Sequence, residues 1–190
     1  MKLTDSRIIT APRSVVWSAL MSVDVLKACV PGCREMQGTA EEGFEATVVQ
    51  KVGPVKATFR GLVTLSNMFE PESLTLSGEG KGGPAGFAKG GADIKLEETP
   101  EGTKLTYEVE ANVGGKLAQL GSRVIDGFAK KMADQFFERF KTEVEESVDD
   151  PESESGASAP DRQAMSEEAT RNGGQAKKSW FAWLKNLFGR

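Results

Sequence analysis

Residues that commonly carry out chemistry are scarce in this sequence. The chain has 190 residues and no histidine, which excludes Ser-His and Cys-His nucleophile pairs and histidine-ligated metals. Its two cysteines, Cys29 and Cys33, lie in the segment CVPGC. Two thiols without histidine cannot complete a four-ligand zinc site or an iron–sulfur cluster within one chain. We expect two reduced, partly buried cysteines, with a disulfide as the alternative.

A glycine motif also has the spacing of a known binding site. GEGKGG, with Gly78, Gly80 and Gly83, matches the dinucleotide fingerprint G-x-G-x-x-G. That fingerprint needs a helix directly after it, whereas Pro84 and another strand pattern follow here. We therefore expect the glycines to permit strong bending of a strand or to leave empty volume beside it.

Three polar side chains are candidates for contact with a ligand. Lys89 and Asp93 lie in a glycine-rich strand pattern, and Tyr107 has an apolar ring with one hydroxyl. Core packing is the alternative role for Tyr107. No constellation supplies both a nucleophile and a matched base, so the sequence predicts a protein that is not an enzyme.

The C-terminal segment KKSWFAWLKNLFGR, residues 177–190, combines large apolar side chains with positive charge. Its apolar positions repeat with helical spacing, which predicts an amphipathic helix. Fourteen helical residues rise roughly 21 Å, too short to cross a bilayer, but a cationic helix with tryptophans can lie in the headgroup layer. The alternative is docking on this protein's own domain or on a partner groove. The predicted membrane-anchor residues are Lys177, Lys178, Trp180, Phe181, Trp183, Leu184, Lys185, Leu187 and Phe188.

The remainder of the chain is acidic. The net charge of −4 combines a tail that has four bases and no acid with residues 1–176, which hold 20 bases and 28 acids. An acidic body argues against nucleic acid as a partner, because nucleic acid needs a basic face. Residues 147–176 contain seven acids, two bases and mostly small side chains. This composition predicts a disordered linker between a domain over residues 1–146 and the tail.

Strand patterns fill the middle of the predicted domain. Apolar and polar residues alternate in GFEATVVQKV, VKATFRGLVTL, GADIKLEE and TKLTYEVEANV, which predicts antiparallel hairpins with one apolar face. Ahead of them, KLTDSRIIT predicts a first strand. APRSVVWSALMS and VDVLKAC predict two short helices, the second with Asp24 as its cap.

The spacing becomes helical after Gly114 and Gly115. An apolar stripe extends over roughly thirty residues and consists of Leu117, Leu120, Val124, Phe128, Met132, Phe136 and Phe140. The element order predicts an α+β fold in which a curved antiparallel sheet wraps around a long C-terminal helix and leaves a hydrophobic cavity. The predicted cavity residues are Trp17, Phe44, Val48, Phe59, Val63, Phe69, Leu76, Phe87, Tyr107, Val109, Leu117, Leu120, Val124 and Phe128.

Three stretches together resemble one family. VWSALMSVDVLKACVPGC, GEGKGGPAGFAKGGADIKL and NVGGKLAQLGSRVIDGFAKKMADQFFERF are similar to the CoxG subunit of carbon monoxide dehydrogenase, the CoxG family, within the START-like helix-grip (SRPBCC) superfamily. The resemblance covers residues 1 to about 146. The family pattern points to three segments, which we interpret as shaping the mouth of the cavity. They are the Pro31-Gly32-Cys33 turn, residues 86–91 and the helix entry at residues 114–116.

The resemblance implies an accessory protein rather than a catalytic one. Its expected partners are a molybdenum hydroxylase of the carbon monoxide dehydrogenase type, an anionic membrane surface and a hydrophobic small molecule. No covalent cofactor is expected, and quinone or another isoprenoid lipid is the candidate ligand. Since the N-terminal MKLTDSRIIT has no signal-peptide core, we expect a cytoplasmic protein on the inner face of the membrane. The alternatives are a membrane adaptor without a ligand and a small cavity enzyme of the cyclase or hydratase type.

Overall fold

The computed structural model describes residues 1–149, so nearly all of the predicted linker and the whole predicted tail helix lie outside the described residues. Its elements follow the order that the sequence predicts. They are β1 Lys2–Ile9, α1 Arg13–Met21, α2 Val23–Cys29, β2 Cys33–Thr39, β3 Gly43–Val52, β4 Val55–Phe69, β5 Ser73–Lys81, the short 3₁₀ turn η1 Gly83–Ala85, β6 Phe87–Thr99, β7 Gly102–Gly114, the 3₁₀ turn η2 Ala118–Leu120 and α3 Ser122–Asp149.

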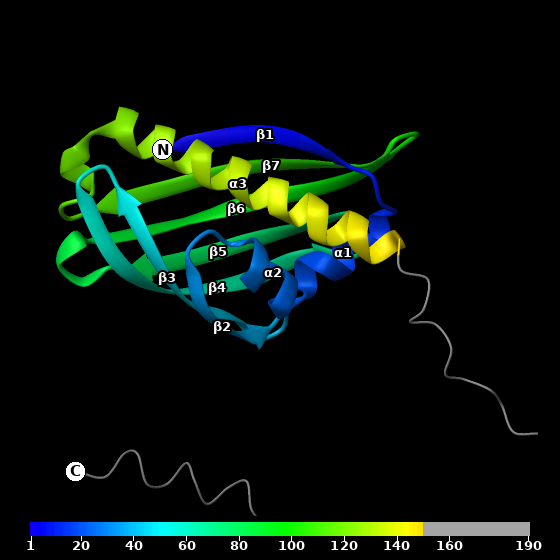
Figure 1. The fold of residues 1–190 in the computed structure, drawn as a ribbon, viewed down its shortest axis with the longest axis horizontal. Helices are drawn as coiled ribbons and strands as arrows, with labels where there is room; N and C mark the ends of the chain where they lie inside the picture. The colour runs from blue at the N-terminus through cyan, green and yellow to red at the C-terminus, as the bar shows by residue number, and fades with distance from the viewer. Residues whose placement is uncertain (150–190) are drawn as a thin grey trace, which may run out of the picture. The chain divides into compact units, whose positions relative to one another are not determined.

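The strands form one antiparallel sheet that curves around the long helix. Its seven strands lie in the order β1-β7-β6-β5-β4-β3-β2, and α3 crosses its inner face (Figure 1). The register places Phe59 opposite Val48 and Ile94 opposite Tyr107. The apolar positions of neighbouring strands therefore lie on the same face of the sheet, as period-2 alternation within each strand requires. The prediction of a curved sheet wrapped around a C-terminal helix is confirmed.

Two local expectations were wrong in detail, and one strand was not predicted. The cap of α2 is Ser22, whose hydroxyl accepts a hydrogen bond from the Val25 N–H at 3.4 Å, while Asp24 lies in the first turn. The long helix begins only at Ser122, because Gly121 adopts φ +82° and separates it from η2. The edge strand β2 was not predicted, because five of its seven residues are exposed and no alternation is visible.

The tightly packed core occupies one end of the sheet. There α1 and α2 lie against the C-terminal half of α3 and against the adjoining halves of β5, β6 and β7. Its buried members are Ile9, Ala11, Val16, Trp17, Leu20, Cys29, Leu74, Ile94, Leu96, Leu105, Tyr107, Phe140 and Val144. We call this the packed end. It fixes the sheet and α3 relative to each other.

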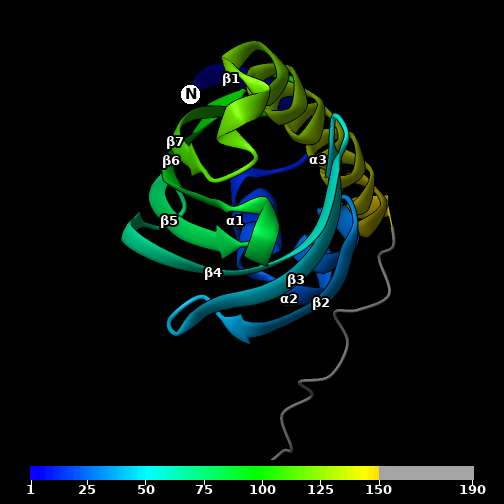
Figure 2. The ribbon, with the colours of Figure 1, turned by 90° about the vertical axis from the view of Figure 1, so that its left-hand side faces the viewer.

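The opposite end of the sheet is formed by three connections. They are the β3–β4 hairpin, the β5–β6 connection with η1, and the β7–α3 connection with η2 (Figures 1 and 2). The Leu117 N–H donates to the Ala85 carbonyl at 3.0 Å, which joins η2 to η1. Gly115, at φ +74°, is required there, because a Cβ would lie 2.6 Å from the Gly86 Cα. We call this the open end.

Candidate functional site

Several apolar side chains on the inner face of the sheet remain only half-buried toward the open end, although Val52, Ala85 and Leu117 are buried there. Val48, Phe59 and Val63 are contributed by β3 and β4, and Phe128 by α3. Val124, in the first turns of α3, is 40 % exposed. In a filled core these residues would be fully covered, as their counterparts at the packed end are. The inner face therefore changes from packed to partly accessible along its length.

The predicted cavity residues fall into three groups. Trp17, Phe44, Tyr107 and Leu117 are buried. The half-buried ones are Val48, Phe59, Val63, Leu76, Val109, Leu120 and Phe128. Phe69, Phe87 and Val124 are exposed.

Two of the exposed residues lie away from the inner face. Phe69 is 67 % exposed at the β4–β5 hairpin. Phe87 pairs with Gly114 on the opposite face of the sheet, where its ring packs over that glycine. Whether the others enclose a ligand stays a prediction.

Tyr107 lies where the packed core meets the half-buried inner face. Its ring stacks on Phe137 with centroids 4.8 Å apart. The hydroxyl is fully buried and has no hydrogen-bond partner among the described residues. Burial raises the pKa of this phenol above its ordinary value. A buried hydroxyl without a partner is costly, which makes this oxygen a candidate for pairing with a polar group of a bound molecule.

An ion-pair network lies on the inner side of β1, near Tyr107. The Arg7 guanidinium contacts Asp5 of its own strand at 2.7 Å and Asp134 of α3 at 2.6 Å. Lys130 Nζ lies 3.3 Å from the same Asp134 carboxylate. The Ser6 backbone N–H, followed by Arg7, holds the pKa of Asp5 below its usual range. This network ties the sheet edge to the middle of α3.

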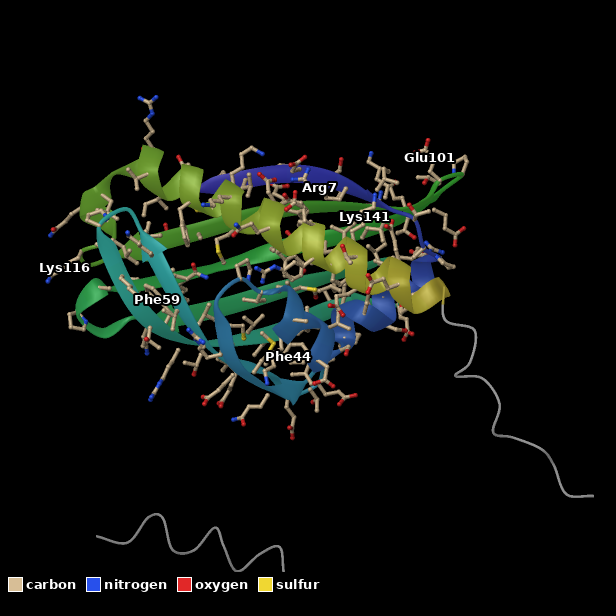
Figure 3. The ribbon with its side chains drawn as sticks, viewed as in Figure 1. Arg7, Phe44, Phe59, Glu101, Lys116 and Lys141 are labelled. Atoms are coloured by element: carbon tan, nitrogen blue, oxygen red, sulfur yellow. The ribbon has the colours of Figure 1, made fainter. Side chains whose placement is uncertain are left out.

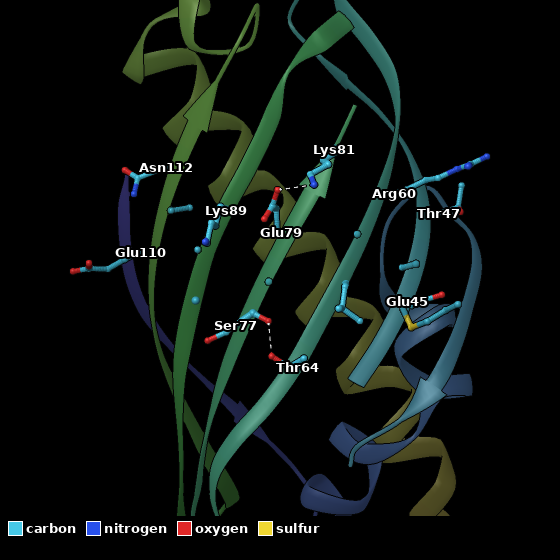
Figure 4. Close-up of a pocket in the computed structure, with 18 of the residues that line it drawn as sticks. Glu45, Thr47, Arg60, Thr64, Ser77, Glu79, Lys81, Lys89, Glu110 and Asn112 are labelled. Carbon is cyan, nitrogen blue, oxygen red and sulfur yellow. Dashed lines mark hydrogen bonds and ion pairs between the residues drawn. The ribbon is translucent and has the colours of Figure 1, made fainter. Parts of the chain in front are cut away.

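A polar trough, which sequence reasoning missed, lies on the face of the sheet that points away from α3. It has a volume of about 1260 Å³, is open, and is lined mainly by charged, hydroxyl and glycine residues of β3 to β7, with small and apolar residues between them (Figure 4). Lys81 pairs with Glu79 at 3.2 Å within it, and Lys89 lies beside them. None of the predicted cavity residues lines it. The available signal was the polar half of each period-2 strand.

The remaining chemical candidates have structural roles. Asp93 accepts a hydrogen bond from the Thr75 hydroxyl at 2.7 Å on the outer face. Cys29 and Cys33 are both free thiols, as expected.

Within residues 1–149, no cluster of acidic or cysteine side chains is arranged to hold a metal ion. The part of GEGKGG in β5 continues into η1 and another strand, so the helix that a dinucleotide site requires is lacking at that place.

The comparisons with known proteins decide the family. Residues 6–145 match the family described as the CoxG subunit of carbon monoxide dehydrogenase. The chain belongs to the CoxG family. Its family name describes a protein associated with carbon monoxide dehydrogenase in an accessory role. No curated protein matches the chain.

Solved structures share the fold of this CoxG-family chain. A conserved protein of Geobacillus kaustophilus is 30 % identical, with a TM-score of 0.72, over 77 % of this chain and 97 % of that one. A protein of Rhizobium leguminosarum is 14 % identical, with a TM-score of 0.60, over 77 % and 95 %. A protein of Thermus thermophilus is 13 % identical, with a TM-score of 0.58, over 77 % and 99 %. The last two show the START-like fold alone.

Two points about this CoxG-family chain bear on its role. The comparisons support an accessory protein associated with carbon monoxide dehydrogenase, and the resemblance seen in the sequence is confirmed. Across the described residues, no helix is both long enough and apolar enough to cross a membrane.

Proposed function

We propose that this protein is a non-catalytic carrier and recruiter. It binds a hydrophobic molecule, with quinone as the candidate, along the inner face of its sheet. It also holds a molybdenum hydroxylase of the carbon monoxide dehydrogenase type at the inner face of the cytoplasmic membrane. The observation that carries the proposal is the half-buried apolar inner face of a chain that belongs to the CoxG family.

The inner face suits a molecule that is mostly apolar. Phe59, Val63 and Phe128 remain partly accessible although each lies between the sheet and α3 or on the strands facing it. Covering these side chains with an apolar ligand removes their surface from water, which contributes about 25 cal/mol for each Å². A hydrophobic guest would therefore bind here more favourably than a polar one.

Tyr107 suits the polar group of such a molecule. A quinone carbonyl is a hydrogen-bond acceptor, and the Tyr107 hydroxyl is a buried donor without a partner in the described part of the chain. The residue lies at the inner limit of the half-buried face, next to the packed core. A ligand ring that enters from the open end would meet this hydroxyl last, with its apolar chain trailing behind.

The C-terminal sequence supports the membrane part of the proposal. Residues 177–190 hold six large apolar side chains and four bases without an acid. Each base contributes about 1 kcal/mol near an anionic lipid surface. Buried apolar side chains add to this attraction. Reversible attachment is the expected result.

The test uses the full chain and a version that ends at Ser153, which keeps all of α3. Both are mixed with phosphatidylglycerol vesicles and sedimented, and bound lipids are extracted for mass spectrometry. We expect the full chain to sediment far more strongly than the shorter version, and both versions to release a quinone or a related isoprenoid. A matched pair of tail variants, Trp180→Ala/Trp183→Ala and Ser179→Ala/Asn186→Ala, separates apolar insertion from a general effect of mutation.

Two outcomes contradict parts of the proposal separately. If neither version sediments, the tail does not bind lipid and membrane recruitment by it is wrong. If the full chain sediments but neither version carries an extractable hydrophobic molecule, the protein is an adaptor and the carrier role is wrong. Recruitment is checked by adding the purified hydroxylase and measuring how much of it sediments with the vesicles.

A further inference from the structure

Positive charge gathers at the open end. Residues 51–60, 79–89 and 112–126 make up the β3–β4 hairpin and the two connections beside it, and they hold seven basic and two acidic residues. The basic side chains are all exposed, and they are Lys51, Lys56, Arg60, Lys81, Lys89, Lys116 and Arg123. Among the described residues, only Lys81 of these has a carboxylate within ion-pair distance.

The register brings like charges directly opposite each other. Lys51 pairs with Lys56 across the β3–β4 hairpin, and Arg60 pairs with Lys81 across β4 and β5. Like charges in opposed positions destabilise a sheet. An anionic surface laid against this end would relieve the repulsion, so the arrangement favours an external negative partner.

The packed end has the opposite charge. Residues 70–72, 97–104 and 138–149 hold ten acidic and three basic residues. Figure 3 shows Lys116 and Phe59 at one end of the molecule, with Glu101 and Lys141 at the other. An anionic surface would therefore attract one end of the domain and repel the other, which fixes the orientation.

Apolar side chains lie among the bases of the open end. Phe87 is 45 % exposed and Val124 is 40 % exposed. A Cβ placed on Gly53 would lie 3.7 Å from Val124 Cγ1, so the hairpin tip and the start of α3 are neighbours. Bases interleaved with exposed apolar groups are typical of surfaces that enter a lipid headgroup layer.

We propose that the open end of the domain docks directly on an anionic lipid surface, independently of the C-terminal tail. The half-buried inner face then opens toward the bilayer, where a hydrophobic ligand can enter or leave without crossing water. The contact is made by Lys51, Lys56, Lys116 and Arg123 around the exposed Val124. This inference rests on the proposed function and adds to it the orientation of the domain.

The tail can reach the same surface. The chain leaves α3 at the packed end, roughly 42 Å along the helix from Ser122. Residues 150–176 span at most about 97 Å when fully extended. The tail and the open end can therefore contact one bilayer at the same time, and two weak contacts joined in one chain reinforce each other.

The test compares two full-length variants with the same change in charge. The open-end variant carries Lys51→Glu, Lys56→Glu, Lys116→Glu and Arg123→Glu. The control carries Lys95→Glu, Lys104→Glu, Arg139→Glu and Lys141→Glu, which lie toward the packed end. Binding to phosphatidylglycerol vesicles is measured by sedimentation, with phosphatidylcholine vesicles as the neutral comparison. Hydrogen exchange of the wild-type chain, with and without vesicles, locates the contact.

We expect the open-end variant to bind phosphatidylglycerol at least tenfold more weakly than wild type, since each base near an anionic surface is worth roughly fivefold in affinity. The control should stay within about threefold of wild type, because its changes lie far from the contact relative to the Debye length. Vesicles should slow exchange in residues 51–57 and 116–126. Circular dichroism checks that both variants are folded.

Each other outcome overturns the inference. Equal weakening in both variants means that net charge alone acts, and unchanged binding of the open-end variant means that the tail alone holds the membrane. If the open-end variant still sediments with the vesicles but no longer brings added hydroxylase down with them, the open end is a protein-docking surface. These results leave the proposed function standing, whereas a wild-type chain that ignores phosphatidylglycerol vesicles contradicts both.

Discussion

The two ends of this domain are built from the same sheet and the same helix, yet only one is closed. At the packed end, α1 and α2 add a third layer over the C-terminal half of α3, and Phe140 and Val144 are completely buried. At the open end, within the described residues, no further helix covers the N-terminal half of α3, and Val124 is exposed. A residue's apolar character is therefore a poor guide to its role here, because its position along the helix decides whether it stabilises the fold or stays available.

Charge divides the domain along the same axis. The packed end is acidic and the open end is basic, although the body of the chain as a whole is acidic. The residues that stabilise the fold therefore lie at the packed end, and those that attract an anionic partner lie at the open end. Mutations at the packed end should mainly change the free energy of unfolding, and those at the open end should mainly change binding.

The largest expected effect compares two phenylalanines on α3. Phe140 is 0 % exposed, and Phe140→Ala should lower the free energy of unfolding by about 3–5 kcal/mol because it leaves a cavity in a packed core. Phe128 is only half-buried, and Phe128→Ala should cost about 1 kcal/mol while reducing the amount of co-purifying hydrophobic ligand. Urea denaturation of both variants measures the difference.

A similar loss of stability in the two variants would contradict the division into packed and open ends. It would mean that the inner face near Phe128 is as well packed as the core around Phe140. Ligand extraction from the Phe128→Ala variant is informative only if its unfolding remains cooperative. Leu62→Ala, on the outer face of β4, serves as a control that should change neither property.

Much of the fold could be predicted because its physical cause is local. Alternation in β3, β4, β6 and β7 and the apolar stripe of α3 are properties of neighbouring residues. The edge strand β2 escaped prediction because it lacks a continuous buried side. The cap at Ser22 escaped because Asp24, also a common capping residue, lies two positions later.

The candidate site was harder to predict because it depends on long-range placement. Lys51 and Arg123 are far apart in the sequence and come to one end only when the β3–β4 hairpin meets the start of α3. The predicted cavity list could not separate Trp17, in the core, from Phe59, on the half-buried face. Alternation places Phe87 on the far face, an odd number of positions from Ile94, only once β6 is known to continue unbroken from Phe87 to Thr99.

The dependence of the free energy of unfolding on pH should test how fully Cys29 is buried at the packed end. Burial, followed by the nearby Glu143 carboxylate, raises the pKa of Cys29 to about 11. The thiol of the unfolded chain loses its proton above about pH 8.5, so the stabilisation from burying the neutral thiol is complete below that pH and is lost as the pH rises toward 11. The loss should reach at most about 3 kcal/mol.

The measurement is the free energy of unfolding of the wild-type chain minus that of Cys29→Ala, under reducing conditions across this pH window. All other titratable groups, including Cys33 and Tyr107, are present in both proteins, so their contributions cancel in the difference. A difference that does not change with pH would show that Cys29 ionises as freely in the folded state as in the unfolded one. Such a result would contradict the burial of the Cys29 thiol in the core.

The smaller effects come from two buried hydroxyls on β7. Thr103 is fully buried, and its hydroxyl donates to the Ala11 carbonyl at 2.8 Å. Thr103→Val keeps the shape but removes the donor, so the free energy of unfolding should fall by about 1–2 kcal/mol. Chemical denaturation checks this value, and Thr103→Ser, which keeps the donor, should recover part of the loss.

Tyr107 should respond in the opposite direction, because its hydroxyl has no partner within residues 1–149. Tyr107→Phe removes the cost of burying an unpaired donor, so the ligand-free protein should gain up to about 1 kcal/mol of stability. Affinity for an added quinone should fall roughly fivefold, as expected for one lost hydrogen bond. A variant that is less stable and binds quinone unchanged would mean that the hydroxyl serves the fold. The inner limit of the half-buried face would then lack a polar contact, and the ligand would be held by apolar surface alone.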